Sequence, residues 1–306
     1  MTGFDDQSEF AEIYGGLGAA AVDVYSALKA EYGLWSRETH NAAGDGQIEL
    51  DAYADSSFLQ SLATCASVRY VISEERPDLV AVNDGRFSVA LDPLDGSKSA
   101  LVGIPSGAIF GIFEDVQQAD DFDGRSIRAS GFFVFGLNLE VFYADSRGVY
   151  RAVYQGTNGW TVTPVPPVLP SSSFFAINTS NQYYWDAWLR RYYNSLVEVD
   201  DGNPTNLRWY ASMVSEVKRL ILQGGVFSYP RDSRAGYENG RLRHIYEALP
   251  MAFLVERLGG GSFDGTGSLL DRRPKSPHER VQVFLGEAEK IQNLAAASLA
   301  DRNSGS

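Results

Sequence analysis

Cysteine and histidine are scarce in this sequence, and their scarcity excludes two kinds of site. Cys65 is the one cysteine, and the three histidines are scattered along the chain at His40, His244 and His278. A single cysteine allows no intrachain disulfide, and neither residue type has the close spacing of a zinc site. Cys65 lies in the apolar segment of residues 62–66. This setting predicts a buried structural thiol.

Basic residues are outnumbered by acidic ones. Lys and Arg total 26 against 39 Asp and Glu, so the formal net charge is −13. Binding to nucleic acid or to an anionic membrane requires a basic surface, so we expect neither partner. An acidic protein that binds phosphate groups needs local cations, and divalent metal ions are the obvious source.

Long hydrophobic runs are also absent. No apolar segment approaches the length of a membrane span, and the polar residues 1–7 contain no signal-like apolar region. No organelle-targeting segment is evident either. We therefore expect a soluble, cytoplasmic protein.

The residues that are present predict alternating helices and strands. Apolar periodicity predicts helices over residues 8–31, 52–66, 184–192, 212–222, 245–258 and 287–299, and strands over residues 68–73, 87–91, 108–113, 132–144, 148–154, 174–177 and 226–229. Such alternation is typical of a layered α/β protein. We interpret residues 114–123 as an exposed acidic loop, and the aromatic residues of 183–192 as core. The segment 163–173, with four prolines and three serines, marks a boundary between halves 1–165 and 166–306.

The central chemical feature is the stretch Leu91-Asp92-Pro93-Leu94-Asp95-Gly96-Ser97-Lys98. Pro93 predicts a tight turn after a buried strand, in which both carboxylates and the Leu94 carbonyl face one point. Oxygen ligands of this kind suit Mg²⁺, and the backbone N–H groups of Gly96 and Ser97 suit a phosphate. The alternative is an ordinary surface turn.

Further acidic residues could join such a site. Glu74 and Glu75 end the strand 68–73, Asp51 begins a predicted helix, Asp45 lies in the loop before it, and Glu247 begins another helix. The structural alternatives are a helix cap for Asp51 and a solvated strand end for Glu74 and Glu75. Basic candidates for phosphate binding are Arg208, Arg241 and Arg243, which could equally be surface arginines.

Several motifs, in the same order along the chain, resemble those of the fructose-1,6-bisphosphatase and sedoheptulose-1,7-bisphosphatase family. The central stretch Asp92-Pro93-Leu94-Asp95-Gly96-Ser97 resembles the signature of that family. Four further blocks agree: Ser73-Glu74-Glu75, Ser212-Met213-Val214, Gly224-Gly225-Val226-Phe227, and Tyr246-Glu247-Ala248-Leu249-Pro250-Met251. The resemblance covers roughly residues 10–290.

The resemblance implies a layered α/β/α/β/α sugar phosphatase that uses two or three Mg²⁺ ions, or Mn²⁺. By position, one metal would be held by Asp92, Asp95 and Glu247. A second would be held by Glu74, Asp92 and the Leu94 carbonyl, and a third by Glu74 and Asp45. Asp51 and Glu75 would activate the attacking water as general base or base relay.

The resemblance also implies how a sugar bisphosphate binds. Gly96, Ser97, Arg241 and Arg243 would surround the 1-phosphate, with Lys98 beside them in place of a serine. Met213 would contact the sugar, and Asn178 and Tyr229 would approach the distal phosphate. Arg208 would reach a neighbouring subunit, since the family forms homodimers or homotetramers.

Departures from the family pattern bear on the substrate. Trp209 and Asn181 stand where the family has phosphate-binding tyrosines. We therefore expect a sedoheptulose-1,7-bisphosphate 1-phosphatase first and a fructose-1,6-bisphosphatase as the alternative. An inositol-phosphate-type monophosphatase and an inactive sugar-phosphate-binding regulator are the remaining hypotheses.

Overall fold

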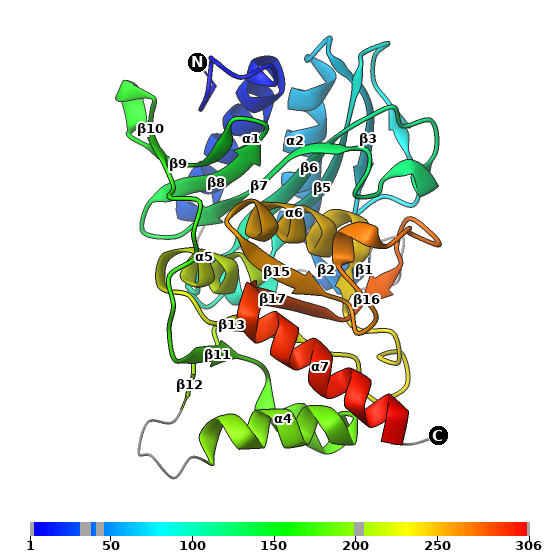
Figure 1. Cartoon of the computed structure of the whole chain (residues 1–306). Helices are drawn as coiled ribbons and strands as arrows, with labels where there is room; N and C mark the ends of the chain where they lie inside the picture. The colour runs from blue at the N-terminus through cyan, green and yellow to red at the C-terminus, as the bar shows by residue number, and fades with distance from the viewer. Residues whose placement is uncertain (1–2, 31–37, 41–45, 199–204, 305–306) are drawn as a thin grey trace.

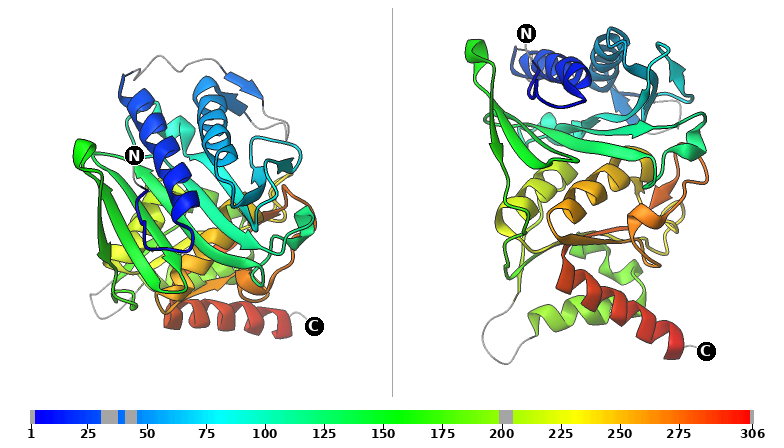
Figure 2. Two further views of the ribbon diagram at one scale, coloured as in Figure 1. Left: turned by 90° about the horizontal axis from the view of Figure 1, so that it is seen from above. Right: turned by 45° about the horizontal axis from the view of Figure 1, so that its top comes forward.

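The computed structural model describes residues 3–30, 38–40, 46–198 and 205–304, and it arranges them in five layers (Figures 1 and 2). Helices α1 (Ala11–Ala30) and α2 (Glu49–Ala63) cover the outer face of a large sheet. Helices α5 (Met213–Gln223) and α6 (Leu249–Arg257) separate this sheet from a smaller one, whose far face carries α4 (Ala187–Val197) and α7 (Ala288–Ser304). The predicted α/β/α/β/α layering is confirmed.

The large sheet has eight strands in the order β10-β9-β8-β7-β6-β5-β3-β4. Its members are β3 (Val68–Ser73), β4 (Val80–Ala81), β5 (Phe87–Asp95), β6 (Gly107–Glu114), β7 (Ile127–Phe135), β8 (Leu139–Asp145), β9 (Gly148–Tyr154) and β10 (Trp160–Pro164). Strands β3 and β5 run parallel, with Ser73 opposite Leu91. The residues directly after this pair, Glu74 after Ser73 and Asp92 after Leu91, therefore emerge at the same edge of the sheet.

The smaller sheet has five strands in the order β12-β11-β13-β17-β15. These are β11 (Phe174–Ala176), β12 (Asn206–Leu207), β13 (Val226–Tyr229), β15 (Gly260–Phe263) and β17 (Val283–Glu287). Two short ladders complete the described strands, namely β1 (Glu38–His40) with β2 (Gly46–Ile48) and β14 (Leu242–Arg243) with β16 (Arg280–Val281). The second ladder leads the chain into α6 and thus into the space between the sheets.

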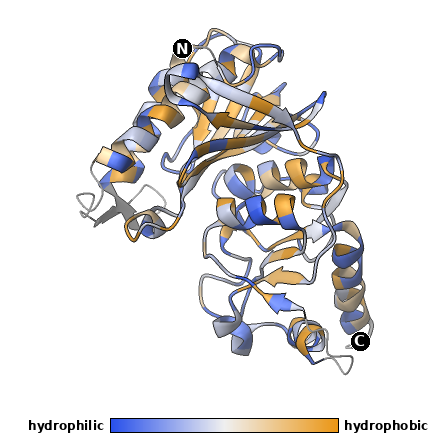
Figure 3. Ribbon diagram, turned by 90° about the vertical axis from the view of Figure 1, so that its left-hand side faces the viewer, coloured by the Kyte–Doolittle hydropathy of each residue, from blue (hydrophilic) through white to orange (hydrophobic). Residues whose placement is uncertain are grey.

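Alternation along the strands of the large sheet separates its two faces. On β5, Val89 and Leu91 face the cluster under α1 and α2, whereas Ala90 faces the cluster that contains α5 and α6. Figure 3 shows hydrophobic residues along these strands and on the helices beneath them. Asp92 lies two residues beyond Ala90, so a regular pleat directs its side chain toward α6.

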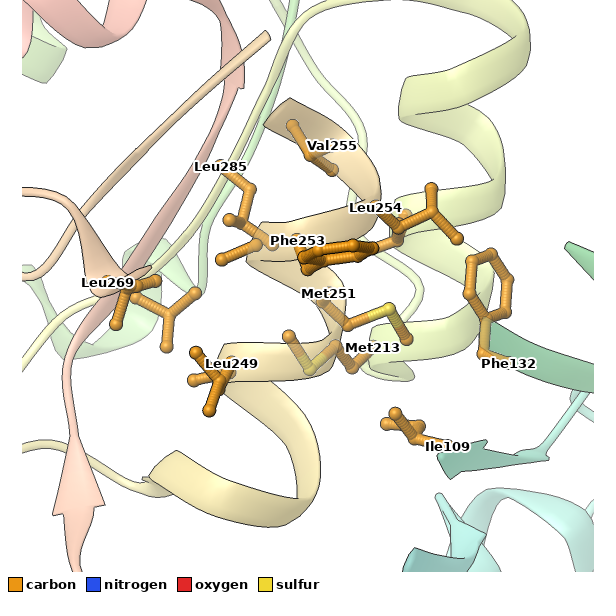
Figure 4. Packing of buried hydrophobic residues seen from close by; sticks show 14 of the residues in the cluster. Ile109, Phe132, Met213, Leu249, Met251, Phe253, Leu254, Val255, Leu269 and Leu285 are labelled. Carbon is orange, nitrogen blue, oxygen red and sulfur yellow. The ribbon is translucent and has the colours of Figure 1, made fainter. Parts of the chain in front are cut away.

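The middle layer forms one continuous core with both sheets. Figure 4 shows Met213 of α5 and Met251 of α6 among Ile109 and Phe132 of the large sheet and Leu285 of the small one. These side chains belong to a single buried cluster. Helices α5 and α6, which belong to the predicted second half, thus share a core with the sheet of the predicted first half. The division at residue 165 stays a prediction.

The strand predicted over residues 132–144 is wrong as a single element. The structure forms two antiparallel strands, β7 and β8, with Phe135 opposite Leu139. Residues 136–138 make the turn between them, and Leu137 at its tip is 96% exposed. The continuous run of β-forming residues concealed the turn, since Gly136 and Asn138 were its only signals.

Two exposure predictions need correction. The segment 114–123 is not simply a solvated loop, because Val116, Phe122 and Asp123 in it are buried. In the aromatic segment, Trp185 and Trp188 are core residues as expected, but Tyr183 is 79% exposed. Its helical spacing was misleading because residues Thr179–Tyr184 form a separate 3₁₀ helix before α4.

Cys65 is buried, as its apolar setting predicted. Among the described residues, no helix is both long enough and apolar enough to cross a bilayer.

Candidate active site

Asp92 and Asp95 lie at the end of β5, where its pairing with β6 is irregular. Asp92 is opposite Ile109 and Asp95 opposite Gly107, so β5 has one residue more than β6 over this interval. The irregularity is a β-bulge at Pro93-Leu94, in place of the predicted free turn. In a regular strand, residues three apart face opposite sides of the sheet. The extra residue allows both carboxylates to face the same side.

Glu247 completes a cluster of three carboxylates with these two residues. One oxygen from each of Asp92, Asp95 and Glu247 lies within 4.8 Å of the others. Asp92 and Glu247 are 3% and 6% exposed, so most of this cluster is shielded from water. Within the described residues, no lysine or arginine forms an ion pair with any of the three carboxylates.

Glu247 reaches the cluster from a π-helical turn, His244–Ala248, that leads directly into α6. Pro250 in the first turn of α6 has no N–H to donate to the preceding turn, which weakens regular α-helical bonding there. A π-turn accommodates this defect and often occurs at functional sites. The helix predicted over residues 245–258 therefore begins as a π-helical turn that carries Glu247, and it continues as an α-helix only from Leu249.

Burial and mutual repulsion disturb the acidity of the cluster. Burial raises the pKa of Asp92 and of Glu247 well above their ordinary values, and the nearby charge of Glu74 adds to both shifts. Burial also raises the pKa of Asp95 to about 6. Three desolvated carboxylates this close together repel one another when ionised. A hard divalent cation with oxygen ligands fits this donor set and would remove the repulsion.

Backbone N–H groups orient each carboxylate. The N–H of Leu94 donates to Asp92 Oδ1 over 3.0 Å, and that of Val214 donates to Asp95 Oδ2 over 3.0 Å. The N–H of Arg243 donates to Glu247 Oε2 over 2.5 Å. The contact to Val214 places Asp95 at the N-terminus of α5, where a negative charge is favoured.

Glu74 and Glu75 follow β3 at the border of the cluster. The N–H of Glu74 donates to the Leu91 carbonyl over 3.0 Å, which fixes the turn against β5. Glu74 Oε1 lies 3.5 Å from Arg243 Nε. The charges of both glutamates raise the pKa of Asp92, so both lie close enough to act on it electrostatically.

Asp55 supports this turn from α2, and the sequence analysis missed it. Its carboxylate accepts a hydrogen bond from Ser73 Oγ over 2.6 Å, and the same Ser73 Oγ accepts the N–H of Glu75 over 3.3 Å. Asp55 also pairs with Arg76 over 2.7 Å. The available signal was its position four residues after Asp51, which places both on one face of a helix.

Asp51 was predicted to act in catalysis and Asp45 to bind metal. Asp51 is buried within the first turn of α2. The helix begins at Glu49, so Asp51 is not the capping residue that the structural alternative proposed. Asp45 lies outside the described residues. The roles of Asp51 and Glu75 in activating water stay predictions.

Gly96, Ser97 and Lys98 form the start of the short helix α3 (Ser97–Ala100), directly after the carboxylates. Gly96 has φ +77°, a left-handed conformation that glycine adopts without strain. The first N–H groups of a helix have no acceptor within it, so those of Ser97 and Lys98 are available to an anion. The side chain of Lys98 is exposed.

The remaining predicted substrate residues lie in the second half, in different surroundings. The side chain of Met213 is buried in the middle core, whereas that of Arg208 is exposed. Asn178 accepts the N–H of Ser180 over 3.2 Å and so caps a 3₁₀ helix. Arg241 lies with its guanidinium carbon 5.7 Å from the ring centroid of Tyr229. The substrate contacts of these residues stay predictions.

Comparison with known proteins agrees with this geometry. Residues 12–163 match the model of the fructose-1-6-bisphosphatase N-terminal domain, and residues 168–298 match that of the C-terminal domain. A class 1 fructose-1,6-bisphosphatase of Cereibacter sphaeroides is 36% identical over 288 residues, which cover 92% of this chain and 87% of that protein. One of Rhodobacter capsulatus is 38% identical over 264 residues, covering 84% and 80%.

The fold has a counterpart among solved structures. The crystal structure of Leishmania major fructose-1,6-bisphosphatase in holo form matches with a TM-score of 0.85 at 23% identity, and covers 98% of this chain and 96% of that one. The fold, the two family models and the identities over most of both lengths agree. The chain belongs to the fructose-1,6-bisphosphatase family, whose members are phosphoric monoester hydrolases acting on sugar bisphosphates.

Proposed function

We propose that this protein hydrolyses the 1-phosphate of fructose 1,6-bisphosphate. The buried cluster of Asp92, Asp95 and Glu247 is the observation that carries the proposal, since it offers three oxygen donors beside free backbone N–H groups. The relatives at 36% and 38% identity are named fructose-1,6-bisphosphatases. Their names favour this substrate over sedoheptulose 1,7-bisphosphate, which departures from the family pattern had favoured.

Asp92, Asp95 and Glu247 would hold a divalent ion, Mg²⁺ or Mn²⁺, and Glu74 and the Leu94 carbonyl could complete a second site. A bound divalent ion would supply charge neutralisation on the phosphoryl oxygens and a more acidic water. The protein would contribute rigidity. The N–H bonds to each carboxylate and the turn at Glu74 hold the ligands in place before the substrate arrives.

Other groups of the chain would orient the substrate and take the proton from the attacking water. The N–H groups of Ser97 and Lys98 would donate to the 1-phosphate, beside the guanidinium of Arg243. Glu75 and Asp51 would accept the proton of the attacking water. The reaction as a whole is one phosphoryl transfer to water: a P–O bond forms to the water oxygen, the P–O bond to the sugar breaks, and the sugar oxygen leaves and takes up a proton. In such a transfer, positioning and electrostatics supply most of the catalysis.

Phosphate release from a panel of sugar phosphates tests the proposal. We expect release from fructose 1,6-bisphosphate in the presence of Mg²⁺ and none after chelation. A larger kcat/KM for sedoheptulose 1,7-bisphosphate would reverse the order of the two substrates. Activity on inositol 1-phosphate alone would indicate a monophosphatase, and binding of metal and sugar phosphate without release would indicate an inactive regulator.

We further propose that the protein acts as a homodimer or homotetramer, as the resemblance implies. The exposure of Arg208 supports a role across a subunit boundary, because its charged group is available to a neighbour. Light scattering coupled to size exclusion should give a multiple of 33.5 kDa. A monomer at working concentrations would reject this proposal.

A further inference from the structure

His278 lies in the loop directly before β16 and forms a long-range hydrogen bond to the turn after β3. Its imidazole Nε2 is 3.0 Å from the carbonyl oxygen of Arg76, which lies 202 positions away in the chain. A carbonyl oxygen can only accept a hydrogen bond, so we assign the proton to Nε2, which donates it. This bond ties the second half of the chain to the turn that carries Glu74 and Glu75.

The imidazole of His278 also packs against a second element of the candidate site. Its ring centroid lies 5.5 Å from that of Tyr246, with the two planes at 46°. Tyr246 is fully buried in the π-helical turn and directly precedes Glu247. Aromatic rings at this separation attract one another. One imidazole therefore contacts both the turn after β3 and the turn that presents Glu247.

The backbone of His278 makes a third contact with the site. Arg243 Nη1 donates to the His278 carbonyl over 2.9 Å, and Arg243 Nε lies 3.5 Å from Glu74 Oε1. Because the chain itself joins Glu74 to Arg76, these contacts close a ring of four residues. We call Glu74, Arg76, Arg243 and His278 the turn clamp.

The loop that carries His278 is fixed by its neighbour Glu279. The Glu279 carboxylate accepts the N–H of Lys275 over 2.8 Å and Nη2 of Arg272 over 2.6 Å. The Glu279 carbonyl accepts the N–H of His244 over 2.8 Å. The His278 side chain is half-buried on this fixed backbone, so it can restrain the groups that it contacts.

Arg76 is held from both halves of the chain. Its guanidinium pairs with Asp55 of α2 over 2.7 Å, whereas its carbonyl accepts from His278. Within the turn, the N–H of Arg76 donates to the Ser73 carbonyl over 3.2 Å, and residues 77 and 78 are exposed. The bond from His278 thus restrains the turn just before the chain leaves for solvent.

We propose that His278 is a positioning residue that fixes the turn after β3, so that Glu74 faces the metal site and Glu75 faces the attacking water. It acts through the Arg76 carbonyl. This inference rests on the proposed function, in which the two glutamates act on metal and water.

Three substitutions of His278 test the proposal by kinetics. The amide nitrogen of glutamine extends about as far from the backbone as Nε2 does, whereas that of asparagine extends only as far as Nδ1. His278→Gln should therefore keep kcat within about 3-fold of wild type. His278→Asn and His278→Ala should lower kcat, or the apparent affinity for Mg²⁺, about 10-fold.

The substrate and a neighbouring side chain provide the controls. At saturating Mg²⁺, KM for fructose 1,6-bisphosphate should change by less than about 2-fold in all three variants, because the turn does not bind the sugar. Lys275→Ala removes an exposed side chain from the same loop and should behave as wild type.

Hydrogen exchange of the backbone amides needs neither metal nor turnover. In chelator, the amide protons of residues 74–76 should exchange several-fold faster in His278→Ala than in wild type, because the turn opens more often. Those of Phe132 and Phe133 on β7 should be unchanged. Equal exchange at residues 74–76 would overturn the inference, and acceleration along the whole chain would overturn it as well.

Mn²⁺ binding, followed by electron paramagnetic resonance, tests whether His278 acts through the turn. On a Glu74→Gln background, His278→Ala should add no further loss of Mn²⁺ affinity. Additive losses, or equal losses in His278→Gln and His278→Ala, would overturn the inference alone. A wild-type protein that binds no Mn²⁺ and hydrolyses no sugar phosphate would overturn the proposed function with it.

Discussion

Asp95 shows, at the scale of one residue, how a buried carboxylate in a functional site can lower the free energy of unfolding. Its carboxyl group has a pKa of about 6 in the folded protein without metal, against an ordinary value of 3.8. Between these values the folded state holds a proton that the unfolded state has released. The contribution of Asp95 to the free energy of unfolding is therefore favourable at low pH and is lost as the pH rises through about 6.

We predict that Asp95→Asn stabilises the metal-free protein at neutral pH and abolishes phosphatase activity. The amide is uncharged and can still accept the N–H of Val214, so the cost of burying a charge is removed while that hydrogen bond is kept. The gain in unfolding free energy should be on the order of 1 to 3 kcal/mol at pH 7.5. Urea unfolding of both proteins in chelator measures it.

The pH dependence provides the control for this prediction. The difference between variant and wild type should nearly vanish at pH 4, where the wild-type group is protonated in the folded protein. A difference independent of pH, or an active variant, would contradict the assignment of Asp95 to the charged cluster.

Asp55 shows, also at the scale of one residue, how a side chain can act through another. It contacts Ser73 and Arg76 directly, and it supports Glu75 only through Ser73. We predict that Asp55→Asn lowers kcat or the apparent affinity for Mg²⁺ about 10- to 100-fold, the range for residues that orient ligands. Substrate KM at saturating Mg²⁺ should change little. Activity assays across a Mg²⁺ titration, with Mn²⁺ binding followed by electron paramagnetic resonance, give both quantities.

Ser73 offers the matched pair for that experiment. Ser73→Thr keeps the hydroxyl that bridges Asp55 and Glu75, and Ser73→Ala removes it. The alanine variant should resemble Asp55→Asn, and the threonine variant should be closer to wild type. Equal activity in all of these proteins would show that the turn needs no support from α2.

At the scale of elements, α6 both supplies Glu247 and fills the space between the sheets. Leu254 on this helix is fully buried in the middle core. We predict that Leu254→Ala lowers the free energy of unfolding by about 2 to 5 kcal/mol, because it leaves a cavity that the packed sheets cannot close. Denaturant unfolding measures the loss.

Leu222 on α5 is the control for this substitution. It is 47% exposed, so Leu222→Ala should change stability by no more than about 0.5 kcal/mol. A loss below 1 kcal/mol for Leu254→Ala would mean that the middle layer is less tightly packed than the structure indicates.

At the scale of the whole molecule, the two halves share one core. Ile72 and Ile109 of the first half and Leu249 and Leu254 of the second belong to the same buried cluster. We predict a single calorimetric unfolding transition, with equal calorimetric and van 't Hoff enthalpies. Residues 1–165 expressed alone should expose the α6-facing side of the large sheet and bind a hydrophobic dye. Two resolved transitions, or a soluble and cooperative fragment, would support independent domains instead.

The sequence by itself determined the class of fold and most of the chemistry. The alternating periodicities predicted a layered α/β protein, and the family resemblance supplied the order of its layers. Asp92 and Asp95 stood out because a buried strand ended in two carboxylates around a proline. These signals are local, since each depends on residues adjacent in the chain. For the same reason, a turn marked only by Gly136 and Asn138 was overlooked within a long run of β-forming residues.

Only the tertiary structure decided how distant residues cooperate. The bulge that turns Asp92 and Asp95 to one side depends on pairing with β6, and Glu247 meets them because α6 packs under that sheet. The hydrogen bond between Asp55 of α2 and Ser73 of β3 likewise joins two elements by packing. A sequence pattern reports which side chains share a face of one element, whereas the distances between elements are set by how the whole core packs.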